Sequence, residues 1–425
     1  MPKIVIVGGG AAGIFAAIGA AELGAPVVLF EKNAQLGKKI LITGNGRCNL
    51  TNIKDIQYFF KEFPGNGSFL HSAFKSLSNL DLIKFFNGIG ITTKVEDKGR
   101  VFPKTDRAQD VVQALTNYLH SLNVQIEFNS PIQEIITQDK AVKGFVVNGK
   151  FHSAPAIIIA TGGLSYPRTG STGDGFRWAA KQGHTIVDLK PSLIPLIVRE
   201  QWCKSLAGLS LKNVELSVFS TSDKNKIAEE TGEILFTHFG LSGPAILSLS
   251  RKVVPYLSLN KQGLKIEINL FPTLNSKDLD KNLQNLLTTN SKKKISNSLN
   301  DLLSNKLLLQ IFSLAGLNKE KFSYQITKGE RFNLGTQLQH FSLTITGTRP
   351  MTEAIVTSGG ICVKELVPST MESRLIKGLF FAGEVIDVDA YTGGYNLQAA
   401  FSTGYVAGKS AAKKFFEREV RSDLR

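Results

Sequence analysis

Cysteine is scarce in this chain: Cys48, Cys203 and Cys362 are the three present in 425 residues. They lie far apart and form no C-x-x-C pair, which argues against a disulfide framework and against a cysteine-rich zinc site. The six histidines show no ligand spacing, and no three of them pair with a cysteine or carboxylate in the sequence. We therefore expect no metal centre.

Long apolar runs are also absent. No window approaches eighteen uninterrupted apolar residues, so no membrane span is expected. The opening MPKIVIVGGG passes directly from a short apolar run to glycines and lacks the longer apolar segment and cleavage site of a signal peptide. These absences favour a cytoplasmic protein without membrane contact.

Two common catalytic signatures are missing as well, the G-x-S-x-G nucleophile elbow and the P-loop. Neither a hydrolase of the elbow type nor a P-loop nucleotidase is therefore indicated. The length exceeds what one simple core accommodates and predicts two or three domains.

Positive charge is abundant and unevenly distributed. The formal net charge is +15, and residues 251–331 hold 14 Lys and Arg against 6 Asp and Glu. Such a basic region attracts anionic partners, including nucleic acid. No aromatic residues interleave with its densest stretch, NSKKKISNSLN, as they would in a base-stacking platform. A solvated helical surface explains the lysines more simply, so a nucleic-acid partner is not favoured.

The N-terminal segment carries a dinucleotide-binding pattern. Gly8, Gly10 and Gly13 form G-x-G-x-x-G between the apolar run KIVIV (3–7) and a helical pattern over 11–24. In this context the glycines allow a tight turn, close approach to a pyrophosphate, and packing of the helix on the strand. The helix N-terminus supplies free N–H groups and partial positive charge for the phosphates.

An acidic residue follows at the expected distance. Glu31 ends the second apolar run, PVVLFEK (26–32), and lies 18 residues after Gly13. A carboxylate there accepts both hydroxyls of an unphosphorylated ribose, which favours FAD or NAD over NADP.

The C-terminal segment GLFFAGEVIDVDAYTGGYNLQAA (378–400) distinguishes between these cofactors. Gly383 and Glu384 place a carboxylate at the end of a buried strand, suited to the hydroxyls of a ribityl chain. The following TGGYNL opens a helix whose N–H groups at Asn396 and Leu397 could stabilise negative charge on a reduced flavin. A cofactor contacted from both chain ends fits FAD better than NAD. Because no second intact G-x-G-x-x-G follows a strand, NAD(P)H would bind transiently or not at all.

The loop TGNGRCNLTN (43–52) leaves several interpretations open: a metal site, a nucleophile, a phosphate cradle or a surface turn. Partner ligands for a metal are missing, and no nearby histidine follows Cys48 to act as its base. Arg47 could depress the pKa of a neighbouring thiol.

Five segments together resemble the bacterial flavoprotein family of the BaiN and aminoacetone-oxidase type. They are VIVGGGAAG, LGKKILITGNGRCNLTN, ATGGLSYPRTGSTGDG, LFTHFGLSGPAILSLS and GLFFAGEVIDVDAYTGGYNLQAA. The resemblance covers essentially the whole chain, and the second, third and fifth segments are specific to the family. One mild departure is Ala390 after DVD, where a second glycine is expected.

The resemblance implies an α/β fold with a Rossmann-like FAD-binding domain split in sequence, an inserted small β domain and a helical cap. The boundaries we expect are 1–192 and 349–425 for the FAD domain, 193–241 and 333–348 for the β domain, and 242–332 for the helical insertion. The cofactor-binding residues that it implies are Gly8, Gly10, Ala11, Ala12, Gly13, Glu31 and Lys32 on the ADP half, Arg47, Cys48 and Asn49 beside the flavin, Ile135 at the adenine through its backbone, Thr161 and Gly162 at the pyrophosphate, and Gly383, Glu384, Asn396 and Leu397 at the ribityl chain and ring.

The implied activity is that of a FAD-dependent oxidoreductase that moves a hydride between flavin and a small organic substrate, by amine oxidation or double-bond reduction. Two alternatives stay open: a flavin-dependent tRNA-modifying enzyme, suggested by the basic insertion, and a FAD-bound redox sensor without a small substrate. The sequence assigns no catalytic acid or base. His238 is a candidate proton donor, although a hydrogen-bonded structural role explains it better. Tyr166 and Tyr391 could bond to substrate, and a place in the pocket wall explains them equally well.

Overall fold

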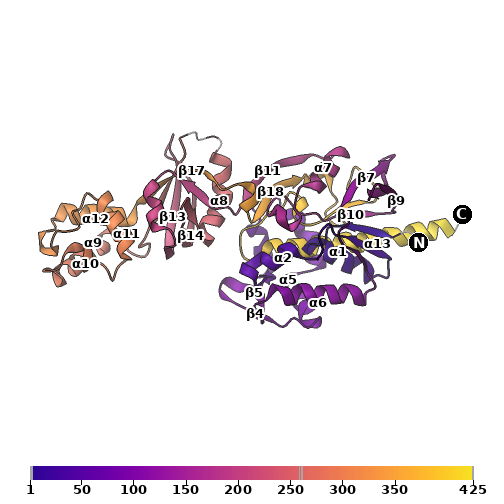
Figure 1. Cartoon of the computed structure of the whole chain (residues 1–425), viewed down its shortest axis with the longest axis horizontal. Helices are drawn as coiled ribbons and strands as arrows, with labels where there is room; N and C mark the ends of the chain where they lie inside the picture. The colour runs from indigo at the N-terminus through magenta and orange to yellow at the C-terminus, as the bar shows by residue number, and fades with distance from the viewer. Residues whose placement is uncertain (1–2, 258, 260–261, 424–425) are drawn as a thin grey trace. The chain divides into compact units, whose positions relative to one another are not determined.

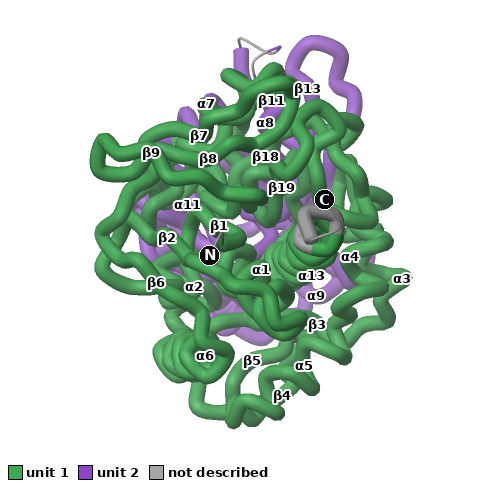
Figure 2. The backbone as a smooth tube through the Cα atoms, turned by 90° about the vertical axis from the view of Figure 1, so that its right-hand side faces the viewer, with its two compact units in different colours: residues 1–191, 351–425 green, residues 192–350 purple. Residues whose placement is uncertain are grey.

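The computed structural model describes residues 3–257, 259 and 262–423. The chain divides into two compact units, Met1–Pro191 with Met351–Arg425 (unit 1) and Ser192–Pro350 (unit 2), which Figure 2 colours separately. Each unit has its own cluster of buried apolar side chains.

Unit 1 is built on a five-stranded parallel sheet with the order β19-β10-β1-β2-β6. Its strands are β1 (Ile4–Val7), β2 (Val27–Phe30), β6 (Gln125–Glu127), β10 (Ile157–Ile159) and β19 (Leu379–Phe381). The three central strands are apolar throughout because helices and loops bury both faces of a parallel sheet. Val7 pairs with Ile159, and Ile159 pairs with Phe381, so the carboxyl ends of β1, β10 and β19 lie side by side.

Two helices from opposite ends of the sequence pack on this sheet with their backbones close together. They are α1 (Ala11–Ala21) and α13 (Tyr395–Asp423). Figure 1 shows β10 of this sheet, with α1 and α13 nearby. A Cβ atom on Gly404 would lie 2.1 Å from the Ala12 carbonyl oxygen, and one on Gly408 would lie 2.0 Å from that of Ala16. Only glycine permits this approach.

The rest of unit 1 forms smaller layers around the parallel sheet. One antiparallel sheet contains β7 (Ile132–Gln138), β8 (Ala141–Val147) and β9 (Lys150–Ser153). A second antiparallel sheet contains β3 (Thr51–Asn52), β5 (Arg100–Pro103) and β4 (Thr93–Val95). A two-stranded sheet pairs β11 (Ile186–Ser192) with β18 (Val356–Ile361). The remaining helices of the unit are α2 (Lys38–Ile42), α3 (Ile56–Phe59), α4 (His71–Ser76), α5 (Asn79–Gly88), α6 (Ala108–Ser121) and α7 (Asp174–Lys181).

Unit 2 contains a closed barrel with the strand order β12-β15-β14-β13-β16-β17. The strands are β12 (Leu196–Val198), β13 (Ser210–Ser220), β14 (Lys226–Phe236), β15 (Gly240–Ser242), β16 (Leu264–Asn269) and β17 (Phe341–Thr348). Helix α8 (Pro244–Leu257) follows β15, and α9 (Ser276–Thr289), α10 (Ile295–Ser298), α11 (Asn305–Leu314) and α12 (Lys328–Gln339) lie between β16 and β17. Barrel and helices share one apolar cluster.

The expected α/β class is confirmed, with a Rossmann-like parallel sheet in a unit that is split in sequence. The details of unit 2 differ from expectation, because β16 lies inside the range 242–332 expected to be helical, and α12 continues to Gln339. The segment LKIEIN alternates buried with exposed or half-buried positions, the period of a strand, within a Lys- and Asn-rich context. Among the described residues, none of the helices is long and apolar enough to cross a membrane.

Candidate cofactor site at the carboxyl edge of the parallel sheet

The glycine loop after β1 contains two glycines that pack closely against other atoms and one glycine, Gly10, that does not. Gly8 has φ +105°, and a Cβ on Gly13 would lie 1.8 Å from the Gly8 carbonyl oxygen, so both positions are needed for the turn and the helix contact. Gly10 has an ordinary φ of −85°, and a Cβ there would meet no described atom within 4 Å. The backbone at Gly10 therefore borders free space, as a cradle for a ligand requires.

The first turn of α1 faces that space with unused donors. The first intrahelical bond runs from Ile14 N–H to the Gly10 carbonyl at 2.9 Å, so the N–H groups of Ala11, Ala12 and Gly13 precede it. Within the described residues no side chain caps this end, and its first turn carries no acidic residue. Free N–H groups and the helix dipole favour negative charge at this end of the helix.

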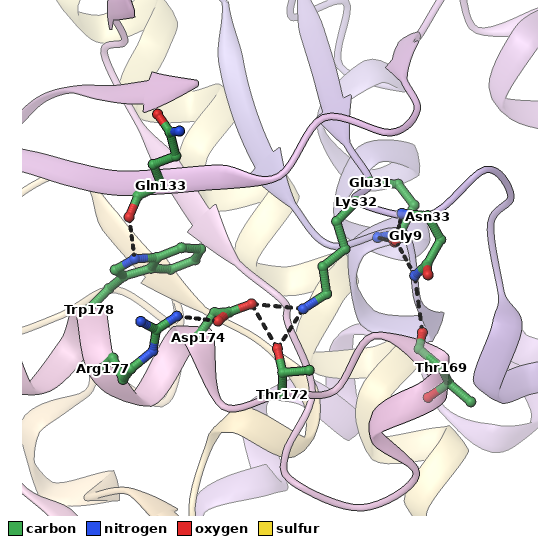
Figure 3. A network of polar contacts seen from close by, with 10 residues as sticks. All are labelled: Gly9, Glu31, Lys32, Asn33, Gln133, Thr169, Thr172, Asp174, Arg177 and Trp178. Atoms are coloured by element: carbon green, nitrogen blue, oxygen red, sulfur yellow. Dashed lines mark hydrogen bonds and ion pairs between the residues drawn. The ribbon is translucent and has the colours of Figure 1, made fainter. Parts of the chain in front are cut away.

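Glu31 is fixed against the same loop. Its side chain is buried, and Oε2 accepts from the Gly9 N–H at 2.7 Å while Oε1 accepts from the N–H and Nδ2 of Asn33 at 2.7 and 2.6 Å (Figure 3). A carboxylate has about four acceptor positions, so one at Oε2 stays available for a ribose hydroxyl.

Lys32 points elsewhere. Its Nζ donates to Thr172 Oγ1 at 2.6 Å and pairs with Asp174 Oδ2 at 2.7 Å, in the first turn of α7 (Figure 3). Burial alone would raise the pKa of the Asp174 carboxyl, but Lys32 and Arg177 hold it below its ordinary value. The ammonium of Lys32, expected at the cofactor, is engaged in this ion pair.

The turn after β10 contains an unpartnered hydroxyl. Thr161 Oγ1 is buried and has no hydrogen-bond partner among the described residues. It lies 2.4 Å from where a Cβ on Gly175 would be, and the next residue, Gly162, has φ +72°. Buried polar atoms are rarely left unsatisfied, so this hydroxyl is an exception among the described residues.

The turn after β19 approaches α1 and carries a pinned carboxylate. Gly383 has φ +75°, and a Cβ there would lie 2.7 Å from Ala12 Cβ. Glu384 Oε2 pairs with Lys39 Nζ at 2.5 Å, and Oε1 accepts from Ser165 Oγ and from the Thr357 N–H, both at 2.8 Å.

The charge of Glu384 is held by its neighbours. Burial by itself would raise the pKa of this carboxyl, but the ammonium of Lys39 keeps it below the ordinary value. Glu384 is therefore an anion with most of its acceptor positions already used, and Lys39 is a member of the site that the sequence did not single out.

The start of α13 presents a second set of helix donors. Its first intrahelical bond runs from Gln398 N–H to the Gly394 carbonyl at 3.1 Å, so the N–H groups of Asn396 and Leu397 precede it. The Asn396 side chain closes the preceding loop, because Oδ1 accepts from Ala390 N–H at 2.9 Å and Nδ2 donates to the Ala390 carbonyl at 2.8 Å. Ala390 is fully buried in this loop.

Arg47 does not offer free charge. Its Nε donates to Asp106 Oδ1 at 2.8 Å, it also pairs with Glu96, and its guanidinium lies 4.2 Å from the centroid of the Phe102 ring. Hydrogen bonds to these two carboxylates raise the pKa of Arg47. The charge expected to face the cofactor is therefore neutralised within unit 1.

The residues that follow Arg47 tie the loop to the other end of the chain. Cys48 is buried, and burial raises the pKa of its thiol to about 12, so it is no thiolate nucleophile. When the side-chain amide of Asn49 is oriented so that both its oxygen and its nitrogen have partners, the oxygen accepts from the Gly394 N–H at 3.0 Å. Thr51 Oγ1 donates to Gln398 Oε1 at 2.6 Å, and Asn52 Nδ2 donates to the Gly393 carbonyl at 3.1 Å.

Ile135 lies in β7, an edge strand. Its carbonyl accepts from Gln182 Nε2 at 3.3 Å, and Trp178 Nε1 donates to the Gln133 carbonyl at 3.2 Å (Figure 3 shows the second contact). The side chains of Trp178 in α7 and Gln182 just after it therefore donate hydrogen bonds to carbonyls of β7, including that of Ile135, which was expected to contact adenine.

The other sequence candidates are placed as follows. Tyr166 follows the β10 turn with φ +51°, and His238 lies in unit 2. Among the described residues no group of three His, Cys, Asp or Glu is arranged to hold a metal ion.

Comparison with known proteins identifies the family. Residues 2–410 match the model described as "HI0933-like protein Rossmann domain". The chain belongs to this family. The expected family membership is thereby confirmed.

Two relatives in this family are enzymes. The 3-dehydro-bile acid delta(4,6)-reductase of Clostridium scindens is 32% identical over 97% of this chain and 100% of its own length. A ribosomal RNA dihydrouridine synthase of Haemophilus influenzae is 31% identical over 96% of this chain and 98% of its own. The chain is thus a member of a family of oxidoreductases.

A solved structure is similar in fold. The 3-ketosteroid delta1-dehydrogenase of Sterolibacterium denitrificans matches with a TM-score of 0.53 and 12% identity, over 97% of this chain and 99% of that protein. At this identity the similarity shows the fold alone.

Proposed function

We propose that this protein binds FAD at the carboxyl edge of the unit 1 sheet and reduces a carbon–carbon double bond conjugated to a carbonyl group. The observation that carries the proposal is the open space at Gly10 beneath the uncapped start of α1. Gly383 brings the β19 turn against Ala12 at the same edge, so both chain ends contribute to one site.

The residues present fit the parts of FAD. The N–H groups of Ala11, Ala12 and Gly13, with Gly10 below, suit the pyrophosphate, and Glu31 suits the ribose. The first turn of α13 suits the flavin ring, because the N–H groups of Asn396 and Leu397 and the helix dipole favour negative charge there.

The remaining implied contacts are weaker. Arg47, Lys32 and the Ile135 carbonyl each have a partner within the protein. We propose that Asn49 acts indirectly, since its contact with Gly394 holds the loop 43–52 against the start of α13.

The reaction follows from the relatives. When bound, reduced FAD supplies a hydride, and a nicotinamide that binds transiently is the proposed source of reducing equivalents. One relative is a reductase of a 3-dehydro bile acid and the other is a synthase of dihydrouridine, and in both compounds the reduced bond is conjugated to a carbonyl. Conjugation makes the distal carbon accept hydride while the neighbouring carbon takes a proton. We propose the same chemistry here rather than amine oxidation.

The test is cofactor identification followed by turnover. Purified protein should release FAD on denaturation and should oxidise NADH or NADPH faster when a conjugated ketone is added under nitrogen. A flavin-free preparation that FAD does not reconstitute would end the proposal. Flavin that cycles with nicotinamide but never with a conjugated ketone or uridine would favour a redox sensor instead.

A further inference from the structure

The helical part of unit 2 joins the basic run to aromatic residues that are distant in sequence. Ser323 N–H donates to the Lys293 carbonyl at 2.9 Å, Ile295 N–H donates to the Lys321 carbonyl at 2.9 Å, and Lys294 lies directly opposite Phe322 in an antiparallel bridge. In such a bridge the two facing side chains lie on the same side of the pair. The structure therefore places an aromatic residue beside a basic run that contains none in its own sequence.

The aromatic rings point outward and are held in place. Phe322 is 39% exposed and Tyr324 is 67% exposed, and their rings stack with centroids 5.9 Å apart and planes 19° from parallel. Ser323 between them is buried, and its Oγ bonds with Ser298 Oγ at 2.7 Å. Tyr324 N–H donates to the Ser291 carbonyl at 3.2 Å. The pair is thus presented to solvent on a fixed backbone, which lowers the entropy lost on binding.

The lysines beside the rings leave charge available. Lys292, Lys293 and Lys294 are all exposed. Lys294 pairs with Glu320 at 2.5 Å, whereas Lys292 and Lys293 form no ion pair with any residue that the structure describes. Lys292 and Lys293 directly precede Lys294 in the chain, so two ammonium groups without an ion pair to a described residue belong to the segment that pairs with Phe322.

We propose that this basic–aromatic surface, made of Lys292, Lys293, Lys294, Phe322 and Tyr324, binds single-stranded RNA. Stacked aromatic rings accept bases on their faces, and adjacent lysines neutralise phosphates, which is how single strands are bound without base-edge contacts. A lipid surface fits less well, because the neighbouring residues Asn290, Ser291 and Asn297 are polar, whereas interfacial helices bury large apolar side chains.

The inference goes beyond the proposed function and does not rest on it. As a binding surface it stands independently, since none of its residues belongs to unit 1. No path of the strand between the units is implied.

The experiment measures binding of a fluorescent oligouridylate to the full-length protein by anisotropy across a salt series. Tyr324→Ser should weaken binding about fivefold or more, since stacking on one ring contributes roughly 1–3 kcal/mol per base, and should leave the salt slope unchanged. The double variant Lys292→Gln, Lys293→Gln should make the slope of log K against log salt shallower by about 1.4, because each phosphate contact on a single strand contributes about 0.7.

The control is a similar pair in unit 1, Tyr58 with Lys61, where Tyr58 is 56% exposed and Lys61 Nζ lies 5.5 Å from its ring centroid. Tyr58→Ser with Lys61→Gln should bind RNA like the parent. The inference would be overturned if the control variant lost as much RNA affinity as Tyr324→Ser, or if Tyr324→Ser bound RNA as tightly as the parent. Binding to anionic phosphatidylserine vesicles without binding to RNA would also overturn it. Absence of RNA binding by a protein that still reduces a conjugated ketone would leave the proposed function intact, whereas RNA binding without any reduction would count against the function and not the surface.

Discussion

At single residues, Gly10 and Gly13 differ in what surrounds a side chain. A Cβ on Gly13 would collide with the Gly8 carbonyl oxygen, whereas one on Gly10 would meet empty space. The fold therefore requires glycine at position 13, and we propose that a bound ligand requires it at position 10.

This difference predicts opposite outcomes for two alanine substitutions. Gly10→Ala should leave the thermal midpoint of the FAD-free protein within about 2 °C of the parent and weaken FAD binding about tenfold, or 1.4 kcal/mol. Gly13→Ala should lower the midpoint by about 5 °C or more, because backbone must move. Thermal denaturation and FAD titration check both, and normal FAD affinity in Gly10→Ala would contradict the cradle.

His184 is a buried residue whose protonation opposes folding. Its Nδ1 lies 3.0 Å from Glu365 Oε2, and its Nε2 lies 2.8 Å from Ser373 Oγ. Burial lowers the pKa of His184, although Glu365 acts in the opposite direction. The native protein therefore binds this proton less readily than the unfolded chain does.

The expected consequence is a loss of stability in mild acid. Above an unfolded histidine pKa of about 6.5 the residue is neutral in both states, and as pH falls below it the unfolded state gains the proton first, so the free energy of unfolding decreases. Urea unfolding between pH 8 and pH 5 should show a flatter dependence in His184→Gln than in the parent. Parallel curves for the two proteins would refute this origin.

At the level of elements, the close contact of α1 with α13 depends on small residues. A Cβ on Gly408 would lie 2.0 Å from the Ala16 carbonyl oxygen, and one on Gly19 would lie 2.5 Å from that of Tyr405. Because both helices begin at the candidate cofactor site, their spacing also sets the positions of the two groups of free N–H donors.

Gly408→Ala should destabilise unit 1 by about 2–4 kcal/mol, since the helices must separate. The matched control is Gly88→Ala at the end of α5, where a Cβ would meet no described atom within 4 Å. That control should be neutral or up to about 1 kcal/mol more stable, because alanine favours helix. Equal effects of the two substitutions would show that helix approach is not what Gly408 provides.

What the sequence could predict at this level was local. The strand–glycine–helix units at both chain ends follow from short apolar runs and glycine spacing, and the α/β class follows from them. Contacts between segments that are distant in sequence cannot be predicted in this way. Asn49, Thr51 and Asn52 belong to a loop that the sequence assigns to ligand binding, yet their side chains form hydrogen bonds with residues 393–398. The pairing of Lys294 with Phe322 was equally unpredictable, because neither segment has a sequence pattern that indicates its partner in an isolated antiparallel bridge.

At the scale of the whole molecule, each unit has its own apolar core, and unit 2 begins and ends at neighbouring strands. Leu196 pairs with Thr348, and the Arg349 N–H donates to the Pro195 carbonyl at 3.2 Å. The two connections to unit 1 therefore leave the barrel side by side, as in a domain inserted into another.

Residues 192–350 expressed alone should consequently fold, with a cooperative thermal transition and the far-ultraviolet spectrum of a mixed barrel and helix domain. The fragment should bind no FAD, since none of the proposed cofactor residues lies in it. A fragment without a cooperative transition would show that unit 2 depends on unit 1 for stability.

The most direct measurement is the reoxidation of reduced, FAD-loaded protein under nitrogen. The protein is reduced anaerobically and mixed with a conjugated cyclic ketone or with uridine-containing RNA, and the flavin absorbance is followed in a stopped-flow instrument. We predict that the absorbance returns at a rate that depends on the added compound, with one double bond saturated per flavin, and that oxygen reacts more slowly. Reoxidation by oxygen alone, with no double bond reduced, would contradict a reductase.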